Sequence, residues 1–285
     1  MNFAVKSSFL PEPMIRQPWS ADYLNPFPIM AVRLLQTLSA EDVEIPEVSK
    51  VIKSDPAFAA ELLRTANSPL FGHSYQIANI ERATTALGLA RITKLAVTIA
   101  LRTYLRNALT TDIAIRCWHH SLATALIAAE LAKEFEQQPD NGYTAGLIHD
   151  IGRLAFLQAF PTGYSLMLEE CNKRNIDILD AERALLGSDH CMAGMWISSE
   201  WRLPTETYRV IWDHHEFPGD SDTSLTALVH TSCGLATRLG LGVFPVEMSA
   251  QDIIHPAPKH IRGYLERNID EMGPKLREKV QSLAQ

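Results

Sequence analysis

Residues 143–157 read YTAGLIHDIGRLAFL, and the pair His149-Asp150 lies in the middle of this stretch. The surrounding positions are apolar on almost every side, which is typical of a helix buried in a protein core. An imidazole and a carboxylate are costly to bury there unless something pairs with them. A bound cation is one such partner, because it takes a neutral histidine and an ionised aspartate. We therefore expect this pair to lie in a buried helix and to bind a metal ion.

The composition predicts a globular protein of the cytoplasm. The chain has 285 residues, 46% of them hydrophobic and 21% charged, which suits one large domain or two modest ones. The net charge of −7 argues against a broad nucleic-acid-binding surface. The four cysteines lie far apart and form no CxxC pair, which favours a reducing compartment. We find neither a signal-peptide pattern nor an apolar run of about 20 residues, so we expect no membrane span.

Helical periodicity runs through almost the whole chain, and alternating strand patterns between Asn-Gly or Asp-Gly turns are missing. The sequence therefore predicts an all-α protein built from two packed helical lobes. Prolines make residues 1–25 an expected extended lead-in. We expect an N-terminal lobe over residues 26–108, a second lobe over 109–243 and a C-terminal helical extension over 244–285.

Capping residues predict where several helices begin and end. Pro46 suits a first helical position, and Asp55-Pro56 predicts a helix that runs to Asn67 and ends at Ser68-Pro69. Asn79 can cap a helix that Gly88 ends. The remaining expectations are a stripe over 29–38, a helix over 113–135, a polar loop over 136–142, the helix of His149-Asp150, a linker through Pro161 and Gly163, a helix capped by Ser188, a helix from Pro204 to His214-His215, a helix over 225–239 and a last helix near 260–283.

Four further histidines are candidate ligands. His120 shares a helical stripe with Cys117 and is expected to point inward, whereas His119 points about 100° away. Each alone has an ordinary explanation, such as a core histidine, a first-turn polar residue or a histidine at a helix C-terminus. Together the candidates suffice for one octahedral site, or for two sites that share one aspartate. The predicted metal ligands are His120, His149, Asp150, His190, His214 and His215.

Three other residue types near these positions carry open alternatives. Arg153, one turn after the His-Asp pair, either holds an anion beside the cations or forms a salt bridge at the helix rim. Gly194, one turn after His190, is expected to let another backbone or a ligand approach closely. Cys233 is expected to pack in the core, although a thiolate there could bind a borderline or soft metal. The polar residues could also form a hydrogen-bond network that binds nothing.

These motifs resemble the HD superfamily of metal-dependent phosphohydrolases, in which one helix carries a His, a second an adjacent His-Asp and a late helix an Asp. WHHS at residues 118–121 and GLIHDIG at 146–152 carry the resemblance and match His120, His149 and Asp150 to that pattern. The histidines at 190, 214 and 215 are similar to the additional ones of the HD-GYP branch, the cyclic-dinucleotide phosphodiesterases.

A closer resemblance, over most of residues 25–240, is to the HDOD family, the HD-related output domain of bacterial signalling proteins. It implies two packed helical lobes, the second an HD-like bundle, and a regulatory role. The motifs that carry it are IKSDPA at 52–57, LLRTANSPLFG at 62–72, ATTALGL at 83–89, WHHSLA at 118–123 and DHCMAG at 189–194. Two departures stand out: Cys233 occupies the position of the late HD aspartate, and no Gly-Tyr-Pro motif follows Glu216.

Two functions therefore compete. The first is a bacterial signal-transduction module with a partly retained HD metal site and little or no turnover, and we favour it. The second is a metal-dependent phosphohydrolase acting on a phosphodiester or phosphomonoester, with Asp150 and Arg153 as catalytic residues. Either would use a divalent cation (Fe, Mn, Ni, Zn or Mg) and no organic cofactor. We expect a protein partner or a small anionic or nucleotide-like ligand, no broad nucleic-acid binding and no membrane; the oligomeric state is open.

Overall fold

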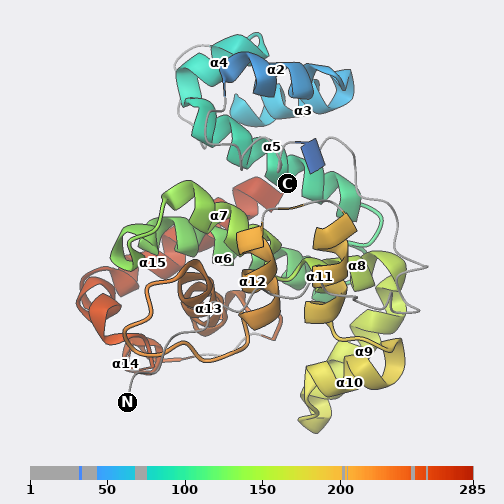
Figure 1. Cartoon of the computed structure of the whole chain (residues 1–285), viewed down its shortest axis with the longest axis vertical. Coiled ribbons are helices and arrows are strands. Elements are labelled where there is room, and N and C mark those ends of the chain that lie inside the picture. The colour runs from blue at the N-terminus through green and yellow to red at the C-terminus, as the bar shows by residue number, and fades with distance from the viewer. Residues whose placement is uncertain are drawn as a thin grey trace, which may run out of the picture.

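The structure, a computed structural model, describes residues 32–33, 44–67, 76–200, 203, 205–244, 248–254 and 256–284. Helices and their connections make up this described part, which contains no strand, so the all-α fold is confirmed. Two groups of helices pack on each other (Figure 1). Four expectations lie outside the described residues: the lead-in over 1–25, most of the stripe over 29–38, the helix stop at Ser68-Pro69 and the helix start at Pro204.

The first lobe contains α2 (Ile45–Lys53), α3 (Pro56–Ala66) and α4 (Ile80–Leu87), which pack on one another and on α5 (Leu89–Leu105). The helix starts are those that the sequence predicts. The Asp55 carboxylate accepts hydrogen bonds from the backbone of Ala57 and Phe58, and the Asn79 side chain accepts one from Arg82 N. Gly88 ends α4 with a φ of +81°, a conformation that favours glycine.

No single helix in the described part combines the length and the hydropathy of a membrane span. Helices α4 and α5 reach both only when taken together, and they meet at a bend of 120°.

The second lobe is built around α6 (Asp112–Leu131), which continues into a 3-10 turn, η3 (Ala132–Phe135). Helix α6 packs against α7 (Pro139–Ile148), α13 (Leu225–Ala236) and the C-terminal α15 (Lys259–Ala284). A Cβ on Gly146 of α7 would lie 2.9 Å from the Cα of Ala125, so only glycine permits this approach of α7 to α6. This lobe and the segment after it also contain α9 (Pro161–Arg174), α10 (Ile178–Leu186), the π-helical turn η4 (Thr237–Leu241) and α14 (Ala250–Ile254).

A second close approach joins α8 (Ile151–Ala159) to α11 (His190–Glu200). A Cβ on Gly152 would lie 1.9 Å from the backbone oxygen of His190, and Gly194 faces Gly152 across the same contact. The predicted close approach at Gly194 is confirmed. Helix α12 (Thr205–Asp213) packs on α11 and α13, so α8, α11 and α12 deliver their ends to one place.

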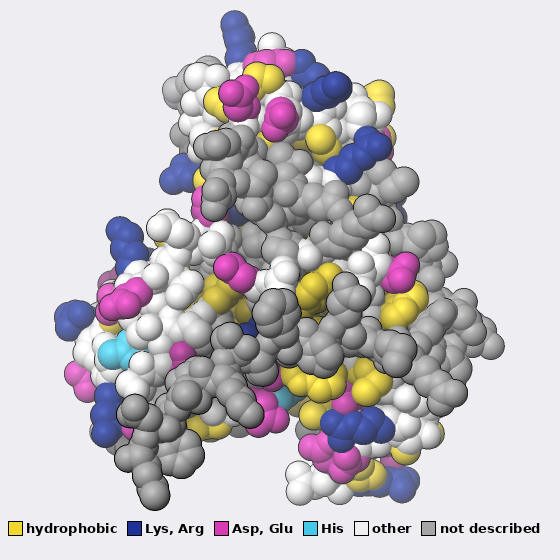
Figure 2. Space-filling view, viewed as in Figure 1, with side chains coloured by type: hydrophobic (Ala, Val, Ile, Leu, Met, Phe, Trp, Pro, Cys, Tyr) yellow, Lys and Arg dark blue, Asp and Glu magenta, His cyan; other side chains and the backbone are white. Residues whose placement is uncertain are grey.

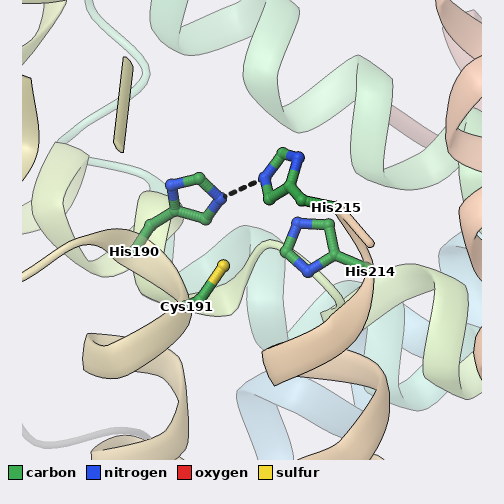
Figure 3. A group of neighbouring side chains, drawn as sticks. All are labelled: His190, Cys191, His214 and His215. Carbon is green, nitrogen blue, oxygen red and sulfur yellow. Dashed lines mark hydrogen bonds between the residues drawn. The ribbon is translucent and has the colours of Figure 1, made fainter. Parts of the chain in front are cut away.

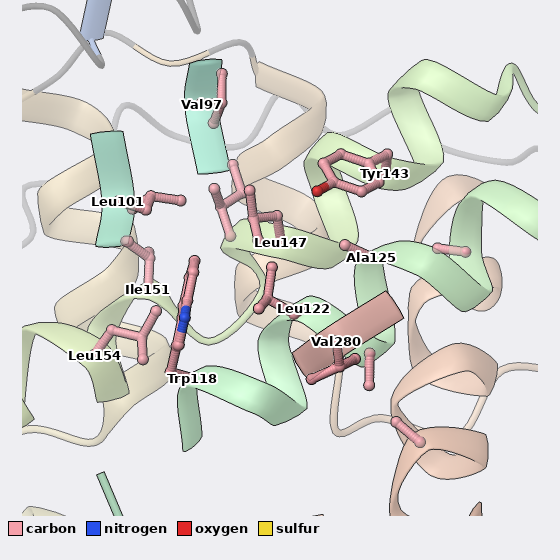
Figure 4. Packing of buried hydrophobic residues seen from close by; sticks show 14 of the residues in the cluster. Val97, Leu101, Trp118, Leu122, Ala125, Tyr143, Leu147, Ile151, Leu154 and Val280 are labelled. Atoms are coloured by element: carbon pink, nitrogen blue, oxygen red, sulfur yellow. The ribbon is translucent and has the colours of Figure 1, made fainter. Parts of the chain in front are cut away.

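The apolar core is continuous between the two lobes. Figure 4 shows Val97 and Leu101 of α5 beside Leu147 and Ile151, at the end of α7 and the start of α8. Trp118 of α6 is fully buried in the same cluster. The core therefore encloses the two residues that follow Leu147-Ile148. The division of the chain at residues 25, 108 and 243 itself stays a prediction.

Several local expectations were wrong. Helix α7 begins at Pro139, inside the predicted polar loop, because proline at a first-turn position starts a helix there. Pro161 likewise begins α9 where we expected a linker, and α10 was not predicted. Helix α11 begins at His190, so the capping position is Asp189, whose carboxylate accepts from Met192 N, and not Ser188 as we expected. His149 and Asp150 are not in the middle of a helix: they form the break between α7 and α8.

Candidate metal centre

The six predicted ligands lie together inside the second lobe. His120 comes from α6, His149 and Asp150 from the break between α7 and α8, and His190 from the first position of α11. His214 and His215 follow the last residue of α12. The imidazole rings form a chain of contacts, with centroids 5.5 Å apart for His120–His149, 5.1 Å for His149–His214 and 5.0 Å for His190–His215. His120 is buried, as predicted from its helical stripe, and His119 is half-buried.

Asp150 occupies the middle of this cluster. Its Oδ1 lies 3.3 Å from His190 Nε2 and 3.4 Å from His214 Nε2. Its Oδ2 lies 3.7 Å from His149 Nε2 and 3.1 Å from the Nη1 of Arg153. The break in the helix explains this position, because a residue with φ −99° and ψ 24° turns its side chain away from the regular helical direction. One carboxylate therefore faces three imidazole nitrogens.

The other ring nitrogen of two histidines is held by the local backbone. His149 Nδ1 donates to Gly146 O at 2.7 Å, and His214 Nδ1 donates to Ile211 O at 2.9 Å. In both cases the acceptor is the carbonyl three residues earlier at a helix end, where carbonyls lack partners within the helix. These bonds place the proton on Nδ1 and leave Nε2 with a free lone pair facing Asp150.

Two more histidines are held by distant segments. His120 Nδ1 donates to Leu241 O of η4 at 3.1 Å, and His190 Nδ1 donates to Glu182 Oε2 of α10 at 2.7 Å. Metal-binding histidines characteristically donate their second N–H to a carbonyl or a carboxylate in this way. All four imidazoles thus present Nε2 as an acceptor toward the interior of the cluster.

Three buried polar atoms at the centre of the cluster have no hydrogen-bond partner among the described residues. They are His149 Nε2, Asp150 Oδ1 and His214 Nε2. All three atoms are acceptors, so they cannot satisfy one another, and burial without a partner is unfavourable. Their ligand atoms lie within 4.8 Å of one another. A divalent cation is the species that would satisfy all three at once, so the residues present fit a metal ion.

The electrostatics favour the protonation states that metal binding requires. Burial lowers the pKa of His149 to about 3, so the imidazole is neutral near pH 7. Burial alone would raise the pKa of Asp150, but Arg153 and the neighbouring histidines hold it well below its usual range. A neutral imidazole and an ionised carboxylate are the forms that bind cations.

Figure 3 shows the side of the cluster formed by α11 and the end of α12. The Nε2 atoms of His190 and His215 lie 2.8 Å apart, and the Cys191 thiol lies near both histidines of the His214-His215 pair. His215 is exposed, whereas the other five predicted ligands are buried. The cluster therefore meets solvent at His215.

Arg153 is buried rather than at a rim. Its Nη1 pairs with Asp150, and its Nη2 donates to His190 Nε2 at 3.4 Å. The alternative of a salt bridge is confirmed, but its expected place at the helix rim is wrong, because α11 covers this face of α8. A role for Arg153 in holding an anion stays a prediction.

Three residues in contact with the cluster escaped the sequence analysis. Glu182 accepts from both the backbone and the ring of His190, and Tyr164 donates to its other carboxylate oxygen. The sequence does carry a signal for Glu182, which lies four residues from Ile178 and from Leu186 and so shares their helix face. His230 of α13 donates from Nδ1 to the backbone oxygen of His214 at 2.8 Å. No local pattern pointed to that contact.

Cys233 of α13 lies against the cluster on the side of α6. Its Sγ is 3.3 Å from His120 Nε2, and because His120 donates from Nδ1, the thiol S–H donates to Nε2. Burial raises the pKa of this thiol to about 12. The expected core packing is thus only part of its role, since its sulfur faces the imidazoles.

The HDOD domain profile matches residues 24–217 of this sequence. The chain belongs to the HDOD family. An HDOD domain protein of Geobacter sulfurreducens, itself of unknown function, has the same fold: it is 25% identical, with a TM-score of 0.71 over 90% of this chain and 93% of that one. The resemblance deduced from the sequence motifs is thereby confirmed, and with it the two-lobed fold.

Two further structures share this fold at lower identity. One, from Marinobacter aquaeolei, is provisionally described as a signal transduction protein (22% identical, TM-score 0.72, 92% of this chain and 60% of that one). The other, from Shewanella amazonensis, is provisionally described as a phosphohydrolase (21% identical, TM-score 0.67, 92% and 94%). An uncharacterized protein of Treponema pallidum is 27% identical over 205 residues, 70% of this chain and 39% of that protein. The chain thus spans about two fifths of the length of this curated relative.

Proposed function

We propose that this HDOD chain is a regulatory signalling module whose second lobe binds a divalent cation and which turns over little or no substrate. One observation carries the proposal: acceptors of His149, Asp150 and His214 that have no partner among the described residues face one another in the interior. A purely structural polar network would pair such atoms with donors. The Nδ1 atoms of His149 and His214 donate to backbone carbonyls, whereas the acceptors that face one another have no donor among the described residues. This is the arrangement of a ligand site.

The position of Arg153 favours regulation over catalysis. A group that stabilises a phosphoryl transition state must reach the substrate, yet this guanidinium is buried and paired with Asp150 at 3.1 Å. Five of the six candidate ligands are buried as well. An anion as large as a phosphodiester would therefore meet His215 first and would find the charged groups behind it already engaged.

Such a module would pass on its signal by binding a protein or a small anionic or nucleotide-like ligand. On the face drawn in Figure 2, basic and acidic side chains of the described residues are interspersed rather than gathered by sign. A mixed surface of this kind suits a protein better than a nucleic-acid backbone. The signal transduction description of the Marinobacter aquaeolei structure points in the same direction.

A second candidate, a metal-dependent phosphohydrolase, is favoured by the exposure of His215 beside the buried His190. A cation reached from that side would lower the pKa of a bound water and supply hydroxide near neutral pH. In that reading His190 and His215 hold the cation, Glu182 orients His190, and Asp150 supplies the negative charge. The Shewanella amazonensis structure is provisionally described as such an enzyme.

Elemental analysis and a hydrolysis assay separate these proposals. Protein purified without chelator is expected to contain close to one equivalent of a divalent metal or more, and Asp150→Asn to contain almost none. With added manganese, wild type and Asp150→Asn should hydrolyse an aryl phosphodiester equally slowly. Turnover by wild type that Asp150→Asn abolishes would support the phosphohydrolase instead, and metal-free wild type would contradict both.

A further inference from the structure

The sulfur of Cys233 belongs to a second group of ligand atoms, separate from His190 and His215. His120 Nε2, His149 Nε2 and Cys233 Sγ all lie within 4.8 Å of one another. His120 and His149 come together through the close approach of α7 to α6 at Gly146, and α13 packs against both helices. Three elements thus deliver two nitrogens and one sulfur to one side of Asp150.

A hydrogen bond alone does not account for this group. The Cys233 thiol has one proton, and it is donated to His120 Nε2 at 3.3 Å. His149 Nε2 is then left buried without a partner among the described residues. Its own N–H is already used at Nδ1, on Gly146 O. One proton therefore satisfies one of two neighbouring acceptors and leaves the other without any.

A cation in place of the thiol proton satisfies all three atoms. We propose that Cys233, His120 and His149 form a sulfur-containing part of the metal centre that selects zinc or another borderline cation over magnesium and manganese. This inference rests on the proposed function, because it requires that the cluster binds metal. On binding, the Cys233 S–H bond breaks, its proton passes to solvent, and the thiolate lone pair forms the bond to the cation.

The chemistry of the donors gives the selectivity. Thiolate and imidazole suit zinc, ferrous and cobaltous ions, whereas magnesium and manganese prefer carboxylate, carbonyl and water oxygens. A carboxylate at position 233 would add a hard ligand, and the thiol replaces it with a soft one. Two imidazoles and one thiolate with Asp150 nearby resemble, in ligand type, the mixed nitrogen and sulfur sets that bind zinc.

Cobalt titration of the full chain tests the proposal, because a thiolate bound to cobalt gives a charge-transfer band in the near ultraviolet. Apo wild type is expected to develop this band as Co²⁺ is added, and zinc should abolish it by displacement. Cys233→Ser should lose the band while still binding Co²⁺ through the histidines around Asp150, and its zinc affinity should fall by roughly tenfold or more. The matched control is Cys171→Ser, a buried cysteine of α9 that lies in none of the three ligand groups and should keep the band.

The outcomes distinguish this inference from the proposed function. If wild type binds no cobalt and no zinc, the metal centre itself is refuted. If wild type binds cobalt without the band, or if Cys233→Ser keeps it, the metal centre stands and the role of Cys233 is wrong. Should Cys233→Ser fail to fold, judged by its helical circular dichroism, Cys191→Ser decides, because Cys191 is the other cysteine in a ligand group among the described residues. The cobalt band must survive in Cys191→Ser, and its loss there would assign the thiolate to Cys191 and overturn the proposal.

Discussion

Buried threonines of the first lobe and buried histidines of the second lobe are bonded in different ways. In the first lobe, Thr84 and Thr93 donate to backbone carbonyls four residues earlier in their own helices, at 2.8 and 2.7 Å. In the second lobe, the imidazoles of His149 and His214 also bond locally through Nδ1, but their Nε2 atoms converge from different elements and have no hydrogen-bond partner among the described residues.

Under the proposed function, this difference separates polar groups that serve the fold from those that serve a ligand. A hydroxyl bonded to its own helix is satisfied wherever that helix lies, so it adds nothing to the arrangement of neighbours. An unpartnered acceptor in the core is a cost that persists in natural proteins where something else is bound. The contrast predicts that substitutions in the two lobes respond differently to metal.

The largest effect is expected from Asp150→Asn. It removes the counter-charge of the buried Arg153, so the free energy of unfolding should fall by about 3 kcal/mol, and cation binding should be lost. Chemical denaturation and calorimetric titration with zinc measure the two effects. Thr84→Val in the first lobe is the matched control, with a loss near 1 kcal/mol and unchanged binding.

A double variant sharpens this result. Asp150→Asn with Arg153→Met removes both charges, so it should recover most of the stability and none of the metal binding. If Asp150→Asn is no more destabilising than Thr84→Val, the buried Asp150–Arg153 ion pair does not stabilise the fold as we expect.

Gly152→Ala should have the next largest effect on stability. A Cβ there meets the backbone oxygen of His190, which cannot move without shifting α11, so we expect a loss of about 3 kcal/mol and weaker metal binding. Gly163→Ala is the control, since no heavy atom lies within 4 Å of the added methyl group. Thermal unfolding of both variants in chelator gives the comparison; equal melting temperatures would break the argument from close packing.

Removal of metal should lower the stability of wild type somewhat less than Gly152→Ala does. A ligand at 100 times its Kd stabilises the folded state by about 2.7 kcal/mol, so a chelator should lower the melting temperature of wild type by several degrees. His214→Gln should show a much smaller difference between chelator and metal, because one converging nitrogen is gone. A first-lobe variant such as Thr93→Val should respond to chelator as wild type does. A wild-type melting temperature that does not change with chelator would contradict this prediction.

Glu182→Gln tests the partner of His190. The amide keeps the shape but removes the charge that orients the ring, so zinc affinity should fall by about 10- to 100-fold with little change in helicity. Competition with a chromogenic chelator gives the affinity. Glu81→Gln, on the first lobe and exposed, is the control and should bind like wild type.

The smallest effect concerns pH. The pKa of His149 is lowered to about 3 in the folded chain, below the 6.5 of an ordinary histidine, so between these values the unfolded state binds a proton that the folded state does not. Stability is therefore full above pH 6.5 and falls as the pH decreases, by up to about 1.4 kcal/mol per pH unit for this group. Denaturation of the metal-free protein at pH 7 and pH 5.5 should show the fall, and His149→Gln should reduce it.

Much of this architecture could be predicted from local signals. Asp55 and Asn79 are side-chain caps that act within four residues, so the first-lobe helix starts follow from sequence alone. The helix break at His149-Asp150 does not, because the flanking apolar residues suit one continuous buried helix as well as two. Its cause is the packing of α7 on α6 and of α8 on α11, which depends on contacts distant in sequence.

The same limit applies to the candidate metal centre. Residue type and motif identified the six converging side chains, because histidine and aspartate on apolar stripes are conspicuous. Glu182 was on such a stripe and was overlooked, whereas His230 and the carbonyl of Leu241 reach the cluster only through the tertiary fold. Which nitrogen of each histidine faces the interior is likewise decided by the backbone around it.

Anomalous X-ray diffraction at the zinc edge, from crystals grown with zinc, tests the central claim most directly. We expect a peak about 2.0–2.1 Å from at least two of the Nε2 atoms of His149, His190 and His214, with Asp150 as a further ligand. A map without an anomalous peak among these side chains, although zinc was present at millimolar concentration, would contradict the account.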